Sequence, residues 1–225
     1  MKNKSYIWVS FIVLVFGIIF IPKIVNRVKN GEITDSDRHE IGKKIDNEKL
    51  LTVGKVAPFE FINQNGDTIN NSNYDGKVYV VEFFFTTCPS ICPIMNKNMI
   101  LLQNEFLSDE NFGIASFSIA PEYDTPEVLK AYADEYGVKN PNWHMMTGDK
   151  NKIYALANKG FNIYVGENAE VDGGFEHSGL FALIDKKGNI RCRKDNFGNP
   201  IIYYDGIEDI GIKMIKEDII KLLKE

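Results

Sequence analysis

VYVVEFFFTTCPSICPIMNKNMILLQNEF, residues 78–106, decides the fold of this protein. Residues 78–85 are rich in β-branched and aromatic side chains, which is typical of a buried central strand. Residues 91–106 repeat apolar side chains at helical spacing, which predicts a helix with one buried face. Cys88 and Cys92 lie between the two elements. The stretch therefore predicts a strand, a turn that carries a pair of cysteines, and a helix.

Strand and helix patterns alternate on both sides of this stretch. Residues 59–62 and 68–70 flank an Asn-Gly step, which predicts a hairpin. The elements expected further along are a strand at 113–120, a helix from Pro126 to about Gly137, a strand at 143–146, a helix at 151–159, strands at 180–185 and 190–193, and a helix at 207–223. Strands that alternate with helices indicate right-handed βαβ units, and the last two strands are expected to add an antiparallel edge. We therefore expect one α/β domain over residues 51–225.

The N-terminus has a different character. Residues 6–22 contain no charged side chain and are flanked by Lys and Arg on both sides, which leaves their orientation open. At about 1.5 Å per residue this run reaches roughly 25 Å, which just spans a hydrocarbon core. A cleaved signal peptide is the alternative, but no small-residue cleavage site follows, and the first cysteine, Cys88, comes too late for lipid attachment. We expect one transmembrane helix that anchors the chain within residues 1–22, followed by a polar tether over residues 23–50.

The overall composition limits the classes of protein that fit. The 225 residues are 44% hydrophobic and 25% charged, which is ordinary for a globular protein and excludes disordered and collagen-like classes. Three cysteines are too few for a disulfide-stapled scaffold. The formal net charge of −5 includes no basic excess, so we expect no nucleic-acid partner. The acidic character beyond the anchor also disfavours adhesion to an anionic membrane surface.

The cysteine pair is the first candidate for a functional site. Cys88 and Cys92 lie where the predicted strand ends and the predicted helix begins. Ligands bind at such strand ends in α/β sheets, and a helix N-terminus stabilises thiolates. A spacing of four brings both sulfurs to one side of the first helical turn, where they can close as a disulfide or bind one metal ion together. A passive structural pair is the alternative, and a redox motif more usually has two intervening residues rather than three.

These features resemble the Sco/SenC proteins, copper-handling relatives of thioredoxin and peroxiredoxin that take part in cytochrome c oxidase assembly. The matching segments are VGKVAPFEFINQNGD from Val53, CPSICP from Cys88, PEYDTP around Asp124, TGD after Trp143, and HSGLFALID from His177. The resemblance implies a thioredoxin-like, peroxiredoxin-related three-layer fold with an N-terminal β-hairpin. It also implies that Cys88, Cys92 and His177 are copper ligands and that the domain lies on the extracytoplasmic, periplasmic side. The sequence departs from the family in Glu176, where an Asp is expected, and in the extra Cys192.

The types of donor also favour copper. Two thiolates and one imidazole form a soft, low-coordinate set that suits Cu(I) and adapts to Cu(II). Zinc usually takes a fourth protein ligand in a structural site, and Cys192 is the only other thiol. Of the three histidines, His39 lies in the tether, and His144 lies in a predicted buried strand, where a core or hydrogen-bonded role is expected. His177 lies in a glycine-containing loop before a strand, so it is the expected ligand.

The residues around this site have more than one interpretation. Asp124 either caps the following helix or tunes the metal site from outside the ligand set. Glu176 either orients His177 or is simply solvated. Cys192 is predicted to be a free surface thiol on an edge strand. Four methionines are predicted to be core residues, although thioethers also bind Cu(I): Met95, Met99, Met145 and Met146.

Two classes of function remain. The favoured one is a membrane-anchored copper metallochaperone that delivers copper to the copper-site subunit of cytochrome oxidase, or reduces that target with the dithiol of Cys88 and Cys92. Outside the cytoplasm such a dithiol needs a thioredoxin-type reductant. The second class is an enzyme of the same fold, a thiol-disulfide oxidoreductase or a thiol peroxidase, which Thr87 beside Cys88 keeps open. A thioredoxin-like enzyme is expected to carry a proline just before the strand at 180–185, and His177 occupies that region instead.

Overall fold

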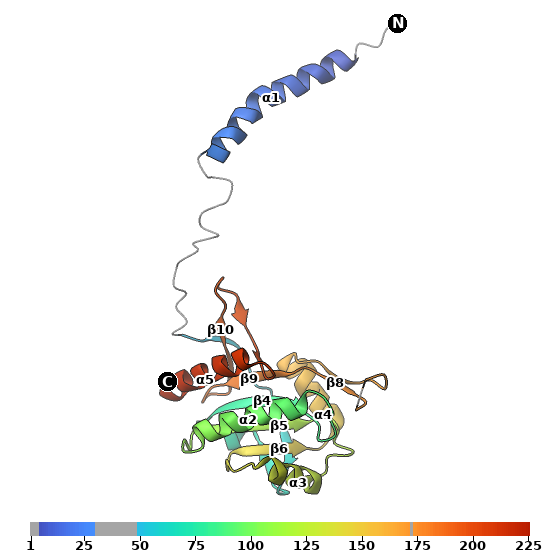
Figure 1. The fold of residues 1–225 in the computed structure, drawn as a ribbon, viewed down its shortest axis with the longest axis vertical. Helices are drawn as coiled ribbons and strands as arrows, with labels where there is room; N and C mark the ends of the chain where they lie inside the picture. Colours follow the sequence, from blue (N-terminus) through green and yellow to red (C-terminus); the bar gives the residue numbers. More distant parts are fainter. Residues whose placement is uncertain (1–4, 30–48, 172) are drawn as a thin grey trace. The chain divides into compact units, whose positions relative to one another are not determined.

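The computed structural model describes residues 5–29, 49–171 and 173–225. They belong to two compact units, residues 1–44 and residues 45–225. Helix α1 (Ser5–Lys29) belongs to the first unit (Figure 1). Among the described residues, no helix combines the length and the apolar character needed to cross a membrane. The anchor predicted within residues 1–22 is therefore unconfirmed and stays a prediction, and most of the tether predicted at 23–50 lies outside the described residues.

The second unit is built on one mixed β-sheet with helices packed on it (Figure 1). From one edge to the other, its strands are β1 (Leu51–Lys55), β10 (Asn189–Lys194), β9 (Leu180–Ile184), β4 (Val78–Phe84), β5 (Phe112–Ser118), β6 (Trp143–Thr147), β2 (Glu60–Asn63) and β3 (Thr68–Asn70). Strands β4, β5 and β6 run parallel, as βαβ units require, and the expected β2–β3 hairpin is antiparallel. Shorter strands complete the set: β11 (Pro200–Ile201) on β10, β12 (Tyr204–Asp205) on β9, and a separate pair, β7 (Val165–Glu167) with β8 (Phe175–His177).

Helices connect and cover these strands. Their bounds are η2 (Asn71–Tyr74), α2 (Cys92–Phe106), α3 (Pro126–Tyr136), α4 (Lys150–Ala155), the π-helical segment η3 (Leu156–Phe161) that continues α4, and α5 (Asp209–Lys224). Local signals set the ends of α3. The Thr125 side chain caps its start by accepting a hydrogen bond from the backbone N–H of Val128, and Gly137 ends it in the left-handed conformation, with a φ of 75°. The predicted helix from Pro126 to Gly137 is thereby confirmed.

The central strand β4 organises the core. All of its residues are buried, and their side chains alternate between the two faces of the sheet. On one face Phe83 stacks on Phe117 of β5 and contacts Phe161 of η3. On the other face Phe84 packs against Tyr132 of α3. The domain therefore has three layers, with the sheet between two layers of helix, as expected.

Strand β4 also buries one carboxyl group. Glu82 is 0% exposed, and its Oε1 accepts a hydrogen bond from Oγ of Ser116 at 2.6 Å. Its Oε2 has no hydrogen-bond partner in the described part of the chain. Burial raises the pKa of Glu82 from its ordinary 4.5 to about 7, and the bond from Ser116 only partly offsets this. The protonation of Glu82 therefore changes near neutral pH.

The late hairpin differs from the prediction in one respect. Strands β9 and β10 form the expected antiparallel pair, but β10 is not an edge strand, because β1 pairs with its other side. Cys192 of β10 lies opposite Leu51 of β1 and is 0% exposed. The thiol is free, but its predicted surface location is wrong, and burial raises its pKa. No strand was expected at β1, so its pairing with β10 was not foreseen.

Candidate metal centre

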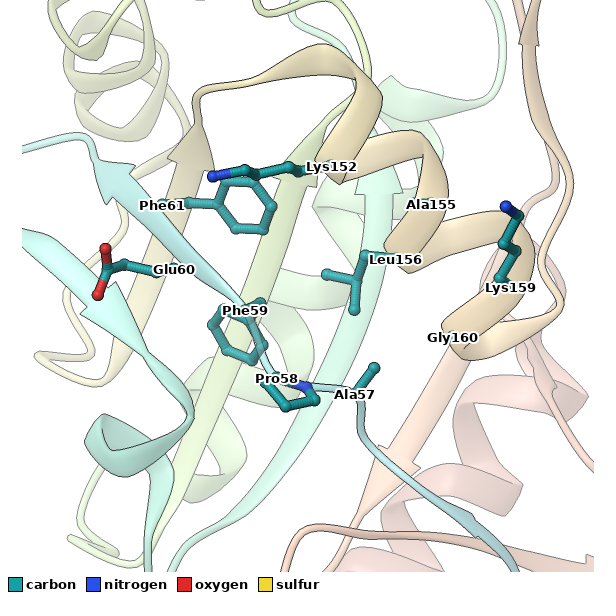
Figure 2. A pocket seen from close by; sticks show the side chains of 10 residues that line it. All are labelled: Ala57, Pro58, Phe59, Glu60, Phe61, Lys152, Ala155, Leu156, Lys159 and Gly160. Carbon is teal, nitrogen blue, oxygen red and sulfur yellow. The ribbon is translucent and has the colours of Figure 1, made fainter.

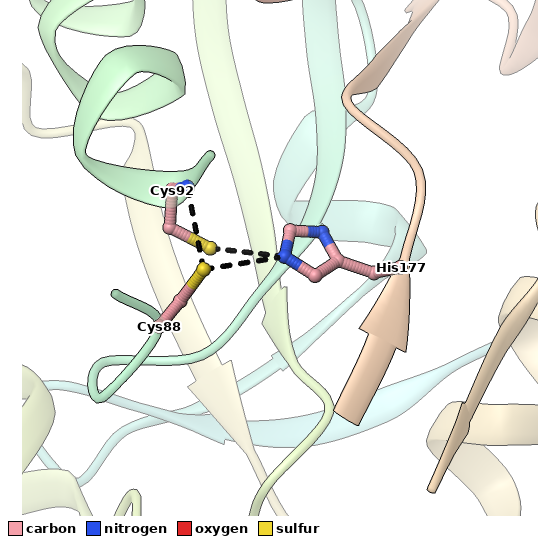
Figure 3. Close-up of side chains that lie close together, drawn as sticks. All are labelled: Cys88, Cys92 and His177. Atoms are coloured by element: carbon pink, nitrogen blue, oxygen red, sulfur yellow. Dashed lines mark hydrogen bonds between the residues drawn. The ribbon is translucent and has the colours of Figure 1, made fainter. Parts of the chain in front are cut away.

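The two cysteines lie in the turn that joins β4 to α2. The backbone N–H of Cys88 donates to the carbonyl of Phe85 at 3.3 Å, which closes the turn. Cys92 is the first residue of α2, and its backbone N–H points to Sγ of Cys88 at 3.4 Å. Cys88 is 7% exposed and Cys92 is 0% exposed, so only Cys88 reaches the surface of the domain. Cys88 lies in the loop before α2, so the fold of this turn, and not the helical spacing expected from the sequence, brings its sulfur close to that of Cys92 (Figure 3).

His177 completes the cluster from a distant part of the chain. It ends strand β8, where it pairs with Val165 of β7. Its Nε2 lies 3.2 Å from Sγ of Cys92 and 3.7 Å from Sγ of Cys88, as Figure 3 shows. The three side chains together form a group whose donor atoms lie within 4.8 Å of one another. Two sulfur donors and one nitrogen donor therefore converge on one point, which is a set suited to a soft, low-coordinate metal ion.

The two thiols are unequal. The hydrogen bond from the Cys92 thiol, together with those from the His177 ring and nearby backbone N–H groups, lowers the pKa of Cys88 well below its usual range. The same thiol–thiol hydrogen bond and burial raise the pKa of Cys92. The two sulfurs therefore titrate as a coupled pair, in which Cys88, the more exposed of the two, ionises more readily than Cys92. Cys88 is therefore the sulfur of the pair that is more readily available as a thiolate.

Glu176 does not orient the imidazole. Its carboxylate accepts a hydrogen bond from Nδ2 of Asn168 at 2.5 Å, across the β7–β8 pair. Glu176 and His177 border the same cavity, but in the described part of the chain no hydrogen bond joins the carboxylate to either ring nitrogen. Within the described residues, Nδ1 of His177 is buried without a hydrogen-bond partner. The ring is held instead by the edge-on packing of Phe85, whose ring centroid lies 5.5 Å away.

Asp124 supports the turn that leads to Cys88. It is 0% exposed and accepts hydrogen bonds from the backbone N–H of Thr86 at 3.1 Å, from the Thr86 hydroxyl at 2.5 Å and from the Ser118 hydroxyl at 2.5 Å. The carboxylate thereby ties the end of β4 to the end of β5. The alternative role as the cap of α3 is wrong, because Thr125 occupies that position.

The remaining histidines and methionines lie apart from the cluster or outside the described residues. His144 lies on β6, where its Nδ1 is 3.2 Å from Nδ2 of Asn63, and burial lowers its pKa. This confirms the hydrogen-bonded role predicted for it. His39 is outside the described residues. All four methionines singled out from the sequence are 0% exposed core residues, as predicted.

A cavity of about 500 Å³ lies beside the donor cluster. Cys88 and His177 form part of its wall, and Phe85, Ile91 and Phe175 supply apolar contacts. Phe85 and Phe175 carry no signal in the sequence that separates them from ordinary core residues. The cavity gives a second molecule access to the cluster without opening the fold.

Comparisons with known proteins point to one family. A family model described as SCO1/SenC matches residues 48–210. The SCO1 protein homolog of Bacillus subtilis is 35% identical over 156 residues, which cover 68% of this chain and 79% of that protein.

Two solved structures have a similar thioredoxin-like fold. One is BsSco, described as a member of the Sco family of cytochrome c oxidase assembly proteins with a disulfide switch. It is 29% identical, with a TM-score of 0.64, and the match covers 76% of this chain and 95% of that one. The other is ScoI of Bradyrhizobium japonicum with copper bound, which is 20% identical with a TM-score of 0.55, over 76% of this chain and 99% of that one. At that identity the second likeness concerns the fold alone.

Proposed function

The chain belongs to the SCO1/SenC family, and on that premise we propose that it is a copper metallochaperone for cytochrome c oxidase assembly. In this proposal Cys88, Cys92 and His177 bind copper, and the copper-site subunit of the oxidase receives it. The observation that carries the proposal is the convergence of two sulfur donors and one imidazole nitrogen within 4.8 Å. This donor set suits Cu(I) and leaves open positions through which the ion can pass to another protein.

Each donor has a distinct part in copper binding. The Cys88 thiolate is available at neutral pH because its pKa is lowered. Cys92 must release its proton when the ion binds, since the thiolate is the metal ligand. To bind copper through Nε2, which faces both sulfurs, the neutral His177 ring must carry its proton on Nδ1. Copper binding therefore releases about one proton from the thiol pair.

In this proposal the oxidation state of the two cysteines controls copper binding. If Cys88 and Cys92 form a disulfide, neither sulfur is a thiolate and the site loses two of its three donors. A thioredoxin-type partner reverses this: its two thiols supply two electrons and two protons to the disulfide and become a disulfide themselves. Such a partner is expected because disulfides persist outside the cytoplasm. The likeness to BsSco, which is described as having a disulfide switch, supports this step.

We also propose that residues 6–22 anchor the protein and that the domain lies on the extracytoplasmic, periplasmic side. The uncharged run of these residues and the family resemblance support this. Confinement to the bilayer of the oxidase raises the effective concentration of the donor at its acceptor, even when their contact is weak. A version without residues 1–48, exported at equal abundance, should therefore restore oxidase activity poorly in a deletion strain under copper limitation.

A thiol-disulfide oxidoreductase or thiol peroxidase is the second candidate. The observation that favours it is the lowered pKa of Cys88, since an activated thiolate is also a nucleophile. The two candidates separate in a deletion strain and in the purified protein. Normal oxidase activity under copper limitation, together with rapid peroxide turnover by the purified chain, would favour the enzyme.

A copper titration tests the site directly. His177→Ala in the reduced full-length chain should weaken Cu(I) binding by at least about 100-fold, because it removes a donor that lies outside the core. His144→Ala is the matched control: it should bind copper like the wild type and instead lower stability, because it loses the contact with Asn63. Copper affinity unchanged by His177→Ala, or lost in His144→Ala at full stability, would contradict the assignment.

A further inference from the structure

The ring of Phe85 contacts the β7–β8 hairpin, which carries His177, at three points. Its centroid lies 5.1 Å from that of the Phe175 ring and 5.5 Å from that of the His177 ring. The third point is Gly173, in the turn between the two strands, where an added Cβ atom would lie only 2.9 Å from the Phe85 ring. Because that distance is too short for a Cβ atom, the absence of a side chain at Gly173 lets the turn rest against the ring. Phe85 is 1% exposed, so close packing fixes the place of its ring.

Phe85 also belongs to the turn that holds the two sulfurs. It follows β4 directly, and its carbonyl accepts the hydrogen bond from the backbone N–H of Cys88 at 3.3 Å. Strands β7 and β8 form a sheet of their own, and no strand of the main sheet pairs with β8 in the part of the chain that the structure describes. The placement of the imidazole relative to the sulfurs therefore depends on the contact between the Phe85 ring and the hairpin.

His177 has no hydrogen bond that could take over this task. A histidine that binds a metal ion is usually oriented by a hydrogen bond at its other ring nitrogen. Among the described residues, Nδ1 of His177 is buried and has no partner, while Nε2 faces the two sulfurs. The orientation of the ring is therefore left to apolar packing.

We propose that Phe85, packed against Gly173, is the positioning residue of the metal centre and sets the distance from Nε2 of His177 to the two sulfurs. The inference rests on the proposed copper function and adds to it a residue that controls the affinity for the ion. Phe85 carries no donor atom in its side chain, so it acts only through the imidazole. Residues that orient a metal ligand typically change metal affinity by about 10- to 100-fold when they are replaced.

Cu(I) titrations of the reduced full-length chain test this role. Phe85→Leu keeps an apolar side chain in the core but removes the ring, and it should weaken Cu(I) binding about tenfold. In the background of His177→Ala the same substitution should not change the affinity further, because Phe85 acts through the imidazole. It should still lower stability in urea unfolding in both backgrounds, because the loss of core packing does not depend on copper. A further loss of affinity in the His177→Ala background would overturn the inference, since Phe85 would then act through the cysteine turn.

Phe61→Leu is the matched control for the loss of a buried ring. Phe61 is 4% exposed and lines a separate cavity of about 670 Å³ between β2 and the segment formed by α4 and η3, where Figure 2 shows its ring near that of Phe59. This variant should lower stability, as Phe85→Leu does, and bind copper like the wild type. An equal loss of copper affinity in the two leucine variants would contradict the positioning role, because it would show a general loosening of the core.

Two glycine variants test the same contact from the side of the hairpin. Gly173→Ala places a Cβ atom against the Phe85 ring, whereas a Cβ atom at Gly174 meets nothing within 4 Å. The two glycines have φ angles of 88° and 78°, so the backbone strain of the two variants is similar. Gly173→Ala should weaken Cu(I) binding about tenfold, and Gly174→Ala should bind copper like the wild type.

The outcomes separate this inference from the proposed function. Copper affinity that is unchanged by His177→Ala would refute the proposed function and this inference with it. A weakened affinity in His177→Ala beside unchanged affinities in Phe85→Leu and Gly173→Ala would refute this inference alone.

Discussion

Glu82→Gln should change how the stability of the protein depends on pH. The carboxyl group is 0% exposed in the central strand, one of its oxygens lacks a hydrogen-bond partner in the described part of the chain, and burial raises its pKa from 4.5 to about 7. Below pH 4.5 it is protonated in both the folded and the unfolded chain, and its ionisation costs nothing. Above pH 7 it is ionised in both, and the folded state bears the cost of a buried charge. Stability is therefore lost as the pH rises from about 4.5 to 7.

The size of the effect follows from the displacement of the pKa. One pH unit of displacement corresponds to about 1.4 kcal/mol, so a pKa raised from 4.5 to about 7 corresponds to about 3 kcal/mol. Glutamine has the same shape and can still accept the hydrogen bond from Ser116, but it carries no titratable proton. The buried amide of the variant lowers stability by an amount that does not depend on pH. Between pH 4.5 and about 7, the free energy of unfolding of the wild type should fall by about 3 kcal/mol relative to that of the variant.

Urea unfolding of the reduced, metal-free chain at intervals from pH 4 to pH 9 measures this difference. Subtracting the unfolding free energy of the variant from that of the wild type cancels the contributions of the other titrating groups. One of these groups is the thiol of Cys88, whose lowered pKa makes stability rise with pH. Glu110→Gln, an exposed position, is the matched control and should follow the wild type at every pH. A difference between wild type and Glu82→Gln that stays constant from pH 4 to pH 9 would refute the reasoning.

Three further substitutions test the supports of the fold and of the site. Asp124→Ala leaves the hydrogen-bond donors of the turn before Cys88 without an acceptor. It should therefore lower the free energy of unfolding in urea by at least about 2 kcal/mol and speed the alkylation of Cys88 by iodoacetamide. An unchanged alkylation rate would contradict the role of Asp124 in the turn. Thr125→Ala removes the cap of α3 and should cost about 1 kcal/mol in thermal unfolding, with copper affinity unchanged. Asp218→Ala removes the fully buried partner of Arg193 and should cost about 3–5 kcal/mol in urea unfolding, and a loss below 1 kcal/mol would show that the remaining bond to Glu217 is sufficient.

The sequence determined the elements whose signals are local. The run of β-branched and aromatic residues made β4 a buried strand, and the Asn-Gly step made the β2–β3 hairpin. Thr125 and Gly137 set the two ends of α3. In each case the backbone dihedrals or the helical period act over a few residues, so the pattern can be read along the chain.

Patterns that look alike locally misled the sequence analysis. The residues around Cys192 resemble those of an exposed edge strand, because basic side chains alternate with it. Whether a strand is at an edge depends on whether another strand pairs with it, and β1 does so from more than a hundred positions earlier in the chain. For Asp124 the sequence left two roles open, and its three hydrogen bonds to residues at the ends of two neighbouring strands exclude the role of helix cap.

Only the tertiary structure decided how the donors meet and what surrounds them. His177 was selected from its loop context, but its distance of 3.2 Å from a sulfur 85 positions earlier depends on the pairing of β8 with β7 and on the packing of Phe85. A side chain's own identity fixes its chemistry and its local backbone preference, whereas its partners are fixed by the packing of segments far apart in the chain.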